Sequence, residues 1–184
     1  MISARKRRAS RGRGRGPTIA CFDRTRDGLG ADLGRLLRGL QRFVDRCVTP
    51  AWGTPARLVR SRGFVRGAWA LVFLDNADKR GELGSHNLTP EGFPIAKVFV
   101  ETANKIDWPL SVAASHELVE MLVDPGINRW TRRARQRTLY AYEAADPVNA
   151  QRFRLGGLPM SNFVYPSYFE SFRNAGTEIG RAHV

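Results

Sequence analysis

Cysteines and long apolar runs are both scarce in this sequence of 184 residues. Its two cysteines, Cys21 and Cys47, cannot form a disulfide framework, and they lack the clustered spacing of a structural zinc site. The longest apolar run, Ala68–Leu74, is far shorter than the roughly 20 residues of a membrane-spanning helix. The basic N-terminus is not followed by the apolar segment of a secretory signal peptide. We therefore expect a cytoplasmic protein that does not enter a membrane.

Acidic residues are absent from the first 16 residues, which contain seven of the 30 lysines and arginines. The rest of the chain has 23 basic and 17 acidic residues, so it carries +6 of the total net charge of +13. A run of arginine and glycine cannot bury apolar surface, which predicts a disordered basic tail at residues 1–17 and a single domain at residues 18–184. Dense arginine suits the binding of nucleic-acid phosphates; an extension without a role is the alternative.

The pattern of apolar residues indicates an α+β domain. Apolar residues recur every three or four positions in residues 32–47, which predicts an amphipathic helix that Thr49-Pro50 ends. A second helix is expected over residues 111–123, and residues 75–94 have the composition of a long loop. The predicted strands are 57–60, 67–74 and 95–100, followed by 152–155 and 158–164 around a two-glycine turn. We expect a small mixed sheet that packs on both helices.

Basic residues, common elsewhere, are missing from two windows of the chain. Residues 106–128 contain no lysine or arginine, and neither do residues 138–150. The first window holds Asp107, Glu117, Glu120 and Asp124, and the second holds Glu143 and Asp146. Carboxylates on a partly buried helix need a counter-charge, because the burial of unpaired charge is costly. A metal ion is the simplest source of that charge.

The second predicted helix carries the pattern His116-Glu117-x-x-Glu120. Residues four positions apart share one face of a helix, so His116 and Glu120 can hold one cation together. The two histidines of the zinc-protease signature H-E-x-x-H do so at the same spacing. Glu117 is rotated by about 100° around the helix, where it can act as a general base toward water. The alternative is a surface helix that carries a histidine and two glutamates by chance.

A catalytic zinc usually has three protein ligands, so a third ligand is expected outside the helix. Glu143 is our choice, and Asp146 would orient His116 by accepting the free ring N–H. If their segment is a strand, Glu143 and Asp146 point to opposite faces, whereas a helical turn would place them on one face. Asp146 and Asp124 therefore stay rival ligands. His86 is a further candidate, as a ligand or as a hydrogen-bond donor; a loop histidine bonded to backbone is the alternative.

Four segments of the sequence together resemble a family of uncharacterised bacterial and phage proteins. The segments are G-E-L-G-S-H-N-L-T-P-E-G-F-P-I-A-K-V-F-V (81–100), A-A-S-H-E-L-V-E-M-L-V-D-P (113–125), Y-A-Y-E-A-A-D-P-V (140–148) and S-N-F-V-Y-P-S-Y-F (161–169). The hallmark of the family is an S-H-E-x-x-E-x-x-x-D-P helix followed by an E-x-x-D-P segment. The resemblance covers roughly residues 31–170 and leaves out the basic tail. This family is similar to the zincin metallopeptidases, especially the gluzincin type, whose third metal ligand is a downstream glutamate.

The resemblance implies a zincin-like domain with Glu117 as the general base. Its metal ligands would be His116, Glu120 and Glu143. Zincin peptidases usually have a histidine where this chain has Glu120. One imidazole and two carboxylates neutralise Zn²⁺ and shift preference toward harder cations such as Mn²⁺ or Ca²⁺. In zincins the strand beside the active-site helix binds peptide by edge pairing, a role that falls to residues 95–100.

We predict a metal-dependent, peptidase-like hydrolase that uses Zn²⁺, or else Mn²⁺ or Ca²⁺, and acts on a peptide or protein. One alternative is a metal-stabilised structural domain without catalytic activity, such as a component of a phage or mobile element. The other is a nucleic-acid-binding protein that uses residues 1–17 and the arginines of residues 129–137. The tail lacks aromatic residues for base stacking, which ranks this alternative last.

Overall fold

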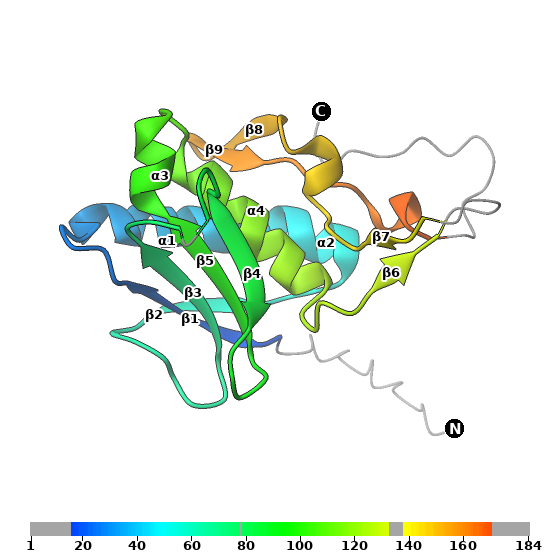
Figure 1. Cartoon of the computed structure of the whole chain (residues 1–184), viewed down its shortest axis with the longest axis horizontal. Coiled ribbons are helices and arrows are strands. Elements are labelled where there is room, and N and C mark those ends of the chain that lie inside the picture. The colour runs from blue at the N-terminus through cyan, green and yellow to red at the C-terminus, as the bar shows by residue number, and fades with distance from the viewer. Residues whose placement is uncertain (1–15, 78, 133–137, 171–184) are drawn as a thin grey trace, which may run out of the picture.

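A mixed β-sheet of five strands forms the centre of the computed structural model (Figure 1). The structure describes residues 16–77, 79–132 and 138–170. The strands of the sheet are β1 (Thr18–Asp23), β2 (Arg57–Arg60), β3 (Trp69–Leu74), β4 (Gly84–Leu88) and β5 (Pro94–Phe99). Their order is β2-β1-β3-β5-β4, in which β4 pairs antiparallel with β5 and the other neighbours pair in parallel. The predicted mixed sheet is therefore present.

The order of the strands corrects two sequence-based predictions. The predicted loop at residues 75–94 is wrong in part, because it contains β4. The sequence of β4, G-S-H-N-L, lacks the β-branched and aromatic residues that favour strands, and its pairing with β5 defines it instead. The prediction of a free edge at residues 95–100 is also wrong, because β5 has β3 on one side and β4 on the other. Strand β4 lies at the end of the sheet.

The N-terminal helical segment continues through the proline that was expected to end it. Helix α1 (Gly30–Phe43) leads into a π-helical turn (Val44–Val48) and then into the short helix α2 (Thr49–Trp52). A proline normally clashes with the carbonyl four residues before it, and we attribute its tolerance here to the wider π turn. Gly53 ends the segment with a φ of 71°, a left-handed conformation that suits glycine.

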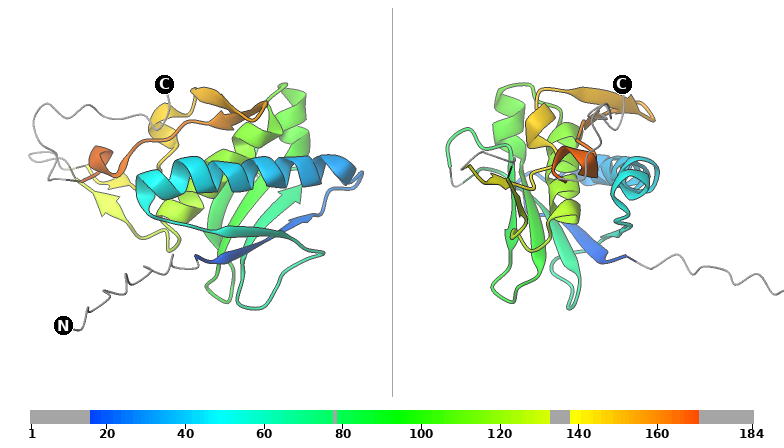
Figure 2. Two further views of the ribbon diagram at one scale, coloured as in Figure 1. Left: turned by 180° about the vertical axis from the view of Figure 1, so that it is seen from behind. Right: turned by 90° about the vertical axis from the view of Figure 1, so that its right-hand side faces the viewer.

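Both long helices lie on one face of the sheet (Figure 2). Helix α4 (Leu110–Val123) follows the short helix α3 (Val100–Lys105) and packs against β4, β5 and α1. Leucines at positions 33, 36, 37 and 40 cover the α1 side of this core. Twelve of the 14 residues of α4 are buried, so a polar side chain on this helix is held in a largely apolar setting. Its histidine and glutamates therefore need partners inside the protein.

Two small antiparallel sheets complete the described structure. They are formed by β6 (Trp130–Thr131) with β7 (Tyr140–Ala141), and by β8 (Arg152–Leu155) with β9 (Leu158–Ser161). Strand β9 packs on α4, so α4 has the sheet on one side and this hairpin on another. Most of the predicted basic tail, and residues 133–137 of the arginine-rich segment, lie outside the described residues. Within the described ranges, every helix is too short or too polar to span a lipid bilayer.

Candidate metal centre

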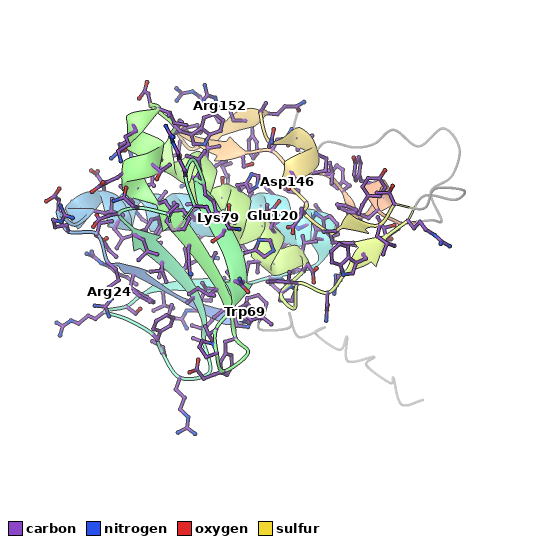
Figure 3. The ribbon with its side chains drawn as sticks, in the orientation of Figure 1. Arg24, Trp69, Lys79, Glu120, Asp146 and Arg152 are labelled. Carbon is purple, nitrogen blue, oxygen red and sulfur yellow. The ribbon has the colours of Figure 1, made fainter. Side chains whose placement is uncertain are left out.

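A cavity of about 580 Å³ lies between α4, β4 and the segment that follows β7. Seven titratable side chains line it: Glu82, and a cluster of six formed by His86, His116, Glu117, Glu120, Glu143 and Asp146. Figure 3 shows Glu120 on α4 and Asp146 on the neighbouring segment. The described residues that line the cavity include no lysine or arginine. The two windows without basic residues thus meet in space, and they meet at this cavity.

The first cluster of possible ligand atoms is centred on His116 Nε2. The Oε1 atom of Glu120, one helical turn further along α4, lies 3.3 Å from it. The Oδ1 atom of Asp146 also lies 3.3 Å from the same nitrogen. Asp146 was expected to bond the other ring nitrogen, but both carboxylates instead converge on one atom. His116, Glu120 and Asp146 therefore form a group that could hold a metal ion.

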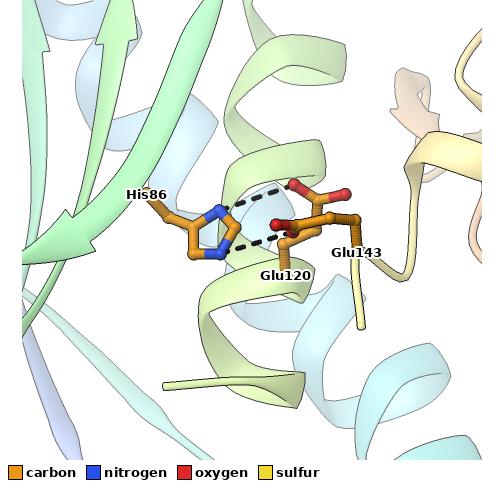
Figure 4. A group of neighbouring side chains, drawn as sticks. All are labelled: His86, Glu120 and Glu143. Carbon is orange, nitrogen blue, oxygen red and sulfur yellow. Dashed lines mark ion pairs between the residues drawn. The ribbon is translucent and has the colours of Figure 1, made fainter. Parts of the chain in front are cut away.

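The second cluster brings in a residue from the edge strand of the sheet (Figure 4). His86 on β4 points toward α4, with its Nδ1 atom 3.6 Å from Glu120 Oε2 and its Nε2 atom 3.4 Å from Glu143 Oε2. Glu117 Oε2 lies 3.7 Å from the same Nδ1 atom. His86, Glu120 and Glu143 form the second group that could hold a metal ion.

The structure divides the ligand set that was predicted from the sequence. His116 and Glu120 stay together, but Glu143 lies with His86 and Asp146 takes the place beside His116. Asp124, the remaining rival, belongs to neither group. Its carboxylate accepts the backbone N–H groups of Asn128 and Arg129, at 3.2 and 2.9 Å. Asp124 therefore stabilises the chain where α4 ends.

The segment that follows β7 begins as an irregular loop and ends in a 3₁₀ turn, and this change of conformation explains the division. Tyr142 stacks on Phe169 with ring centroids 4.4 Å apart, and the Ala144 carbonyl accepts the Val164 N–H at 2.8 Å. Glu143 lies between these two anchored residues and lines the cavity. A 3₁₀ turn (Asp146–Val148) then begins and places Asp146 on the His116 side. Both carboxylates reach the same cavity by different routes.

Glu120 fixes this segment on α4. Its Oε1 atom accepts hydrogen bonds from the backbone N–H groups of Ala145 and Asp146, each at 3.2 Å. Ala145 is fully buried, so its N–H has no access to water. A buried donor without an acceptor costs about 1–3 kcal/mol, and Glu120 removes that cost at this position. The Glu120 carboxylate thus holds the segment that carries Glu143 and Asp146 against helix α4.

Strand β4 crosses directly above Glu117, and glycine at position 84 makes this possible. A Cβ atom at Gly84 would lie 2.6 Å from Glu117 Oε1, which is closer than the two atoms can approach. The Glu117 side chain is only 9% exposed, although it lines the cavity. The close approach brings His86 and Glu117 to one side of the cavity. No feature of the sequence indicates this contact, because the composition of residues 75–94 predicts a loop.

Ion pairing sets the protonation of His116. Burial lowers the pKa of His116, but hydrogen bonds to Asp146 and Glu120 outweigh burial and raise the pKa to about 10. The hydrogen bond from His116 holds the pKa of Asp146 below its usual value. When no cation is bound at neutral pH, His116 is therefore protonated. Its positive charge then balances part of the carboxylate cluster.

On the other side of the cavity, the carboxyl groups have raised pKa values. Burial is the main cause that raises the pKa of Glu117, and the charge of Glu120 adds to the effect. Burial and then repulsion from Glu120 raise the pKa of Glu143 to about 7. Burial lowers the pKa of His86, but a hydrogen bond to Glu117 and the charges of Glu143 and Glu120 raise it overall. The cavity as a whole favours bound positive charge.

The free energy of unfolding of the metal-free protein is expected to fall as pH rises. A group whose pKa is higher in the folded state stabilises the fold at low pH and loses this contribution as pH passes the folded pKa. Glu143 loses its contribution between pH 4.5 and about 7, and His116 between pH 6.5 and about 10. Denaturant unfolding of chelator-treated protein at about pH 5, 7 and 9 measures the trend. In His116→Gln the decrease above neutral pH should become smaller, and an unchanged decrease would contradict the assignment.

Comparison of the chain with protein-family models, with curated proteins and with solved structures found no match. Function is therefore inferred from the geometry and chemistry of the cavity. The six titratable side chains of the cluster come from three separate parts of the chain, and five of them lie in the two windows that lack basic residues. Only His86 lies outside those windows, and its place depends on β4.

Proposed function

We propose that this chain is a metal-dependent hydrolase with a zincin-like domain, acting on amide bonds in peptides or proteins. The observation that carries the proposal is the convergence of Glu120 Oε1 and Asp146 Oδ1 on His116 Nε2. The three atoms belong to residue types that bind divalent cations, and their cavity has no lysine or arginine among its described lining residues. The motif resemblance to zincins supports the same conclusion.

The donor atoms fit a divalent cation of intermediate hardness. One imidazole with two carboxylates suits Zn²⁺, and the carboxylates also suit Mn²⁺ or Ca²⁺. His116, Glu120 and Asp146 would hold the ion. A divalent cation supplies Lewis acidity, which polarises a carbonyl group and makes water more acidic.

Glu117 is the proposed general base. It lines the cavity beside Glu120 but belongs to neither group of converging ligand atoms. A base is most effective when its pKa is near the working pH, and burial raises the pKa of Glu117 in that direction. Glu117 would accept a proton from water and later give it to the leaving amine.

Strand β4 is the proposed binding edge for an extended peptide. It is the last strand of the sheet, and no described strand pairs with its outer side. Gly84, Ser85 and His86 of this strand line the cavity, so a peptide that paired with β4 would pass the ligand cluster. The role that the resemblance implies for residues 95–100 is therefore assigned to β4.

Metal analysis tests the first step of the proposal. Protein purified without chelator or affinity metal is expected to contain a divalent cation, and His116→Ala should reduce the metal content per chain. Asp124→Asn is the matched control, because Asp124 lies outside both groups and asparagine keeps one of its two acceptor oxygens. Elemental analysis of the three proteins, purified together, gives the result. Equal metal content in wild type and His116→Ala would contradict the proposal.

A further inference from the structure

We propose that the cavity binds two divalent cations, with Glu120 shared between them. His116 and Asp146 would complete the first site, and His86 and Glu143 the second. The proposed function requires only the first ion, so the second site extends that proposal and can fail without it.

The two oxygens of Glu120 face different histidines. Oε1 lies 3.3 Å from His116 Nε2, and Oε2 lies 3.6 Å from His86 Nδ1. Because each carboxylate oxygen can bind a cation, one glutamate in this position can serve two ions. The two groups of ligand atoms share Glu120 and otherwise use different residues. Two ions held close together by shared ligands are a common arrangement in hydrolases.

Two buried atoms without a hydrogen-bond partner give a further indication of the second site. The His86 side chain is only 8% exposed, and neither its Nε2 atom nor Glu143 Oε2 has a hydrogen-bond partner within the described structure. The two atoms lie 3.4 Å apart, and both residues line the cavity. A buried polar atom without a partner is costly, and most such atoms in folded proteins are paired. A cation held by His86 and Glu143 would satisfy both atoms at once.

The count of formal charges also favours two ions. Of the carboxylates that line the cavity, the four beside the histidines, Glu117, Glu120, Glu143 and Asp146, carry four negative charges when ionised, and neutral histidines add none. One divalent cation would leave an excess of two negative charges among these four carboxylates, and the described lining of the cavity offers no lysine or arginine. A second divalent cation balances the cluster. The alternative is that a protonated His86 serves as a permanent counter-ion to Glu117 and Glu120.

Metal stoichiometry decides between these arrangements. The full chain is freed of metal with a chelator and titrated with Zn²⁺, and separately with Mn²⁺, by calorimetry; elemental analysis after dialysis checks the count. Wild type should bind two equivalents, and His86→Ala and Glu143→Gln one each. Asn87→Ala, at the next position of β4, is the matched control and should keep two. Glu143→Gln is the smaller change and keeps the test valid if His86→Ala does not fold.

Each outcome has a distinct meaning for the two proposals. One equivalent in wild type that is unchanged by His86→Ala and Glu143→Gln would overturn the second site and leave the proposed hydrolase intact. Two equivalents without any hydrolysis would support the second site and overturn the catalytic proposal. No metal binding by wild type would overturn both.

Discussion

Glu117→Gln is expected to abolish measurable hydrolysis and to leave the bound metal in place. Glutamine has the shape of glutamate but cannot accept a proton at neutral pH. A positioned general base contributes about 10²- to 10⁴-fold to a reaction rate, so kcat/KM should fall by that factor. Metal binding should persist, because Glu117 belongs to neither group of converging ligand atoms. The predicted result is thus a protein that still binds metal but does not hydrolyse peptides.

A broad peptide library, analysed by mass spectrometry, detects cleavage whichever peptide sequence the protein prefers. Glu91→Gln is the matched control, since it makes the same chemical change at an exposed position. Elemental analysis of each sample confirms that the compared proteins carry equal metal. Cleavage by Glu117→Gln at the wild-type rate would exclude Glu117 as the base. No cleavage by metal-loaded wild type would leave a metal-stabilised structural domain as the function.

Two substitutions of Glu120 are expected to lower metal content equally but stability unequally. Both Glu120→Gln and Glu120→Ala remove the charge that the two histidines share. Glutamine keeps a carbonyl oxygen for the backbone N–H groups of Ala145 and Asp146, whereas alanine leaves them without an acceptor. In the metal-free state, the alanine variant should therefore be less stable than the glutamine variant by about 1–3 kcal/mol.

Denaturant unfolding of the two chelator-treated variants measures this difference directly. Because both variants lack the same negative charge, electrostatic repulsion from Glu117 and Glu143 is relieved equally in each. Equal stability of the two proteins would show that the hydrogen bonds to Ala145 and Asp146 contribute little. Full metal content in Glu120→Gln would contradict the assignment of Glu120 as a ligand.

The elements with strong apolar periodicity could be predicted from the sequence. The leucines of α1 and the apolar run of β3 determine where those elements lie, because burial against the sheet gives each a clear pattern. Strand β4 could not be predicted, since its stability comes from backbone pairing with β5 rather than from its own residues. Pro50 in α2 led to a wrong prediction of the end of the helix for a related reason. Its effect depended on the π turn before it, which no local rule anticipates.

The site was predictable where it depended on helical spacing and not where it depended on tertiary contacts. His116 and Glu120 share a face of α4 because four residues make about one turn. The distribution of Glu143 and Asp146 between two histidines depended on a segment that enters a 3₁₀ turn at residue 146. His86 entered the cluster only because β4 forms over Glu117. The residues that sequence reasoning proposed for the site, apart from Asp124, all line the cavity, but their grouping was not predicted and Glu82 was not proposed.

The hydrogen bonds from the main chain to Glu120 have a consequence for how the centre is loaded. Backbone N–H groups hold Oε1 in position whether or not an ion is present, so the two halves of the cavity are already in register. An ion that bound at the proposed site would then replace protons on ready-made ligands, and no described loop would have to fold around it. Such a centre would be able to empty and refill as the supply of trace elements changes, while the described fold kept its shape.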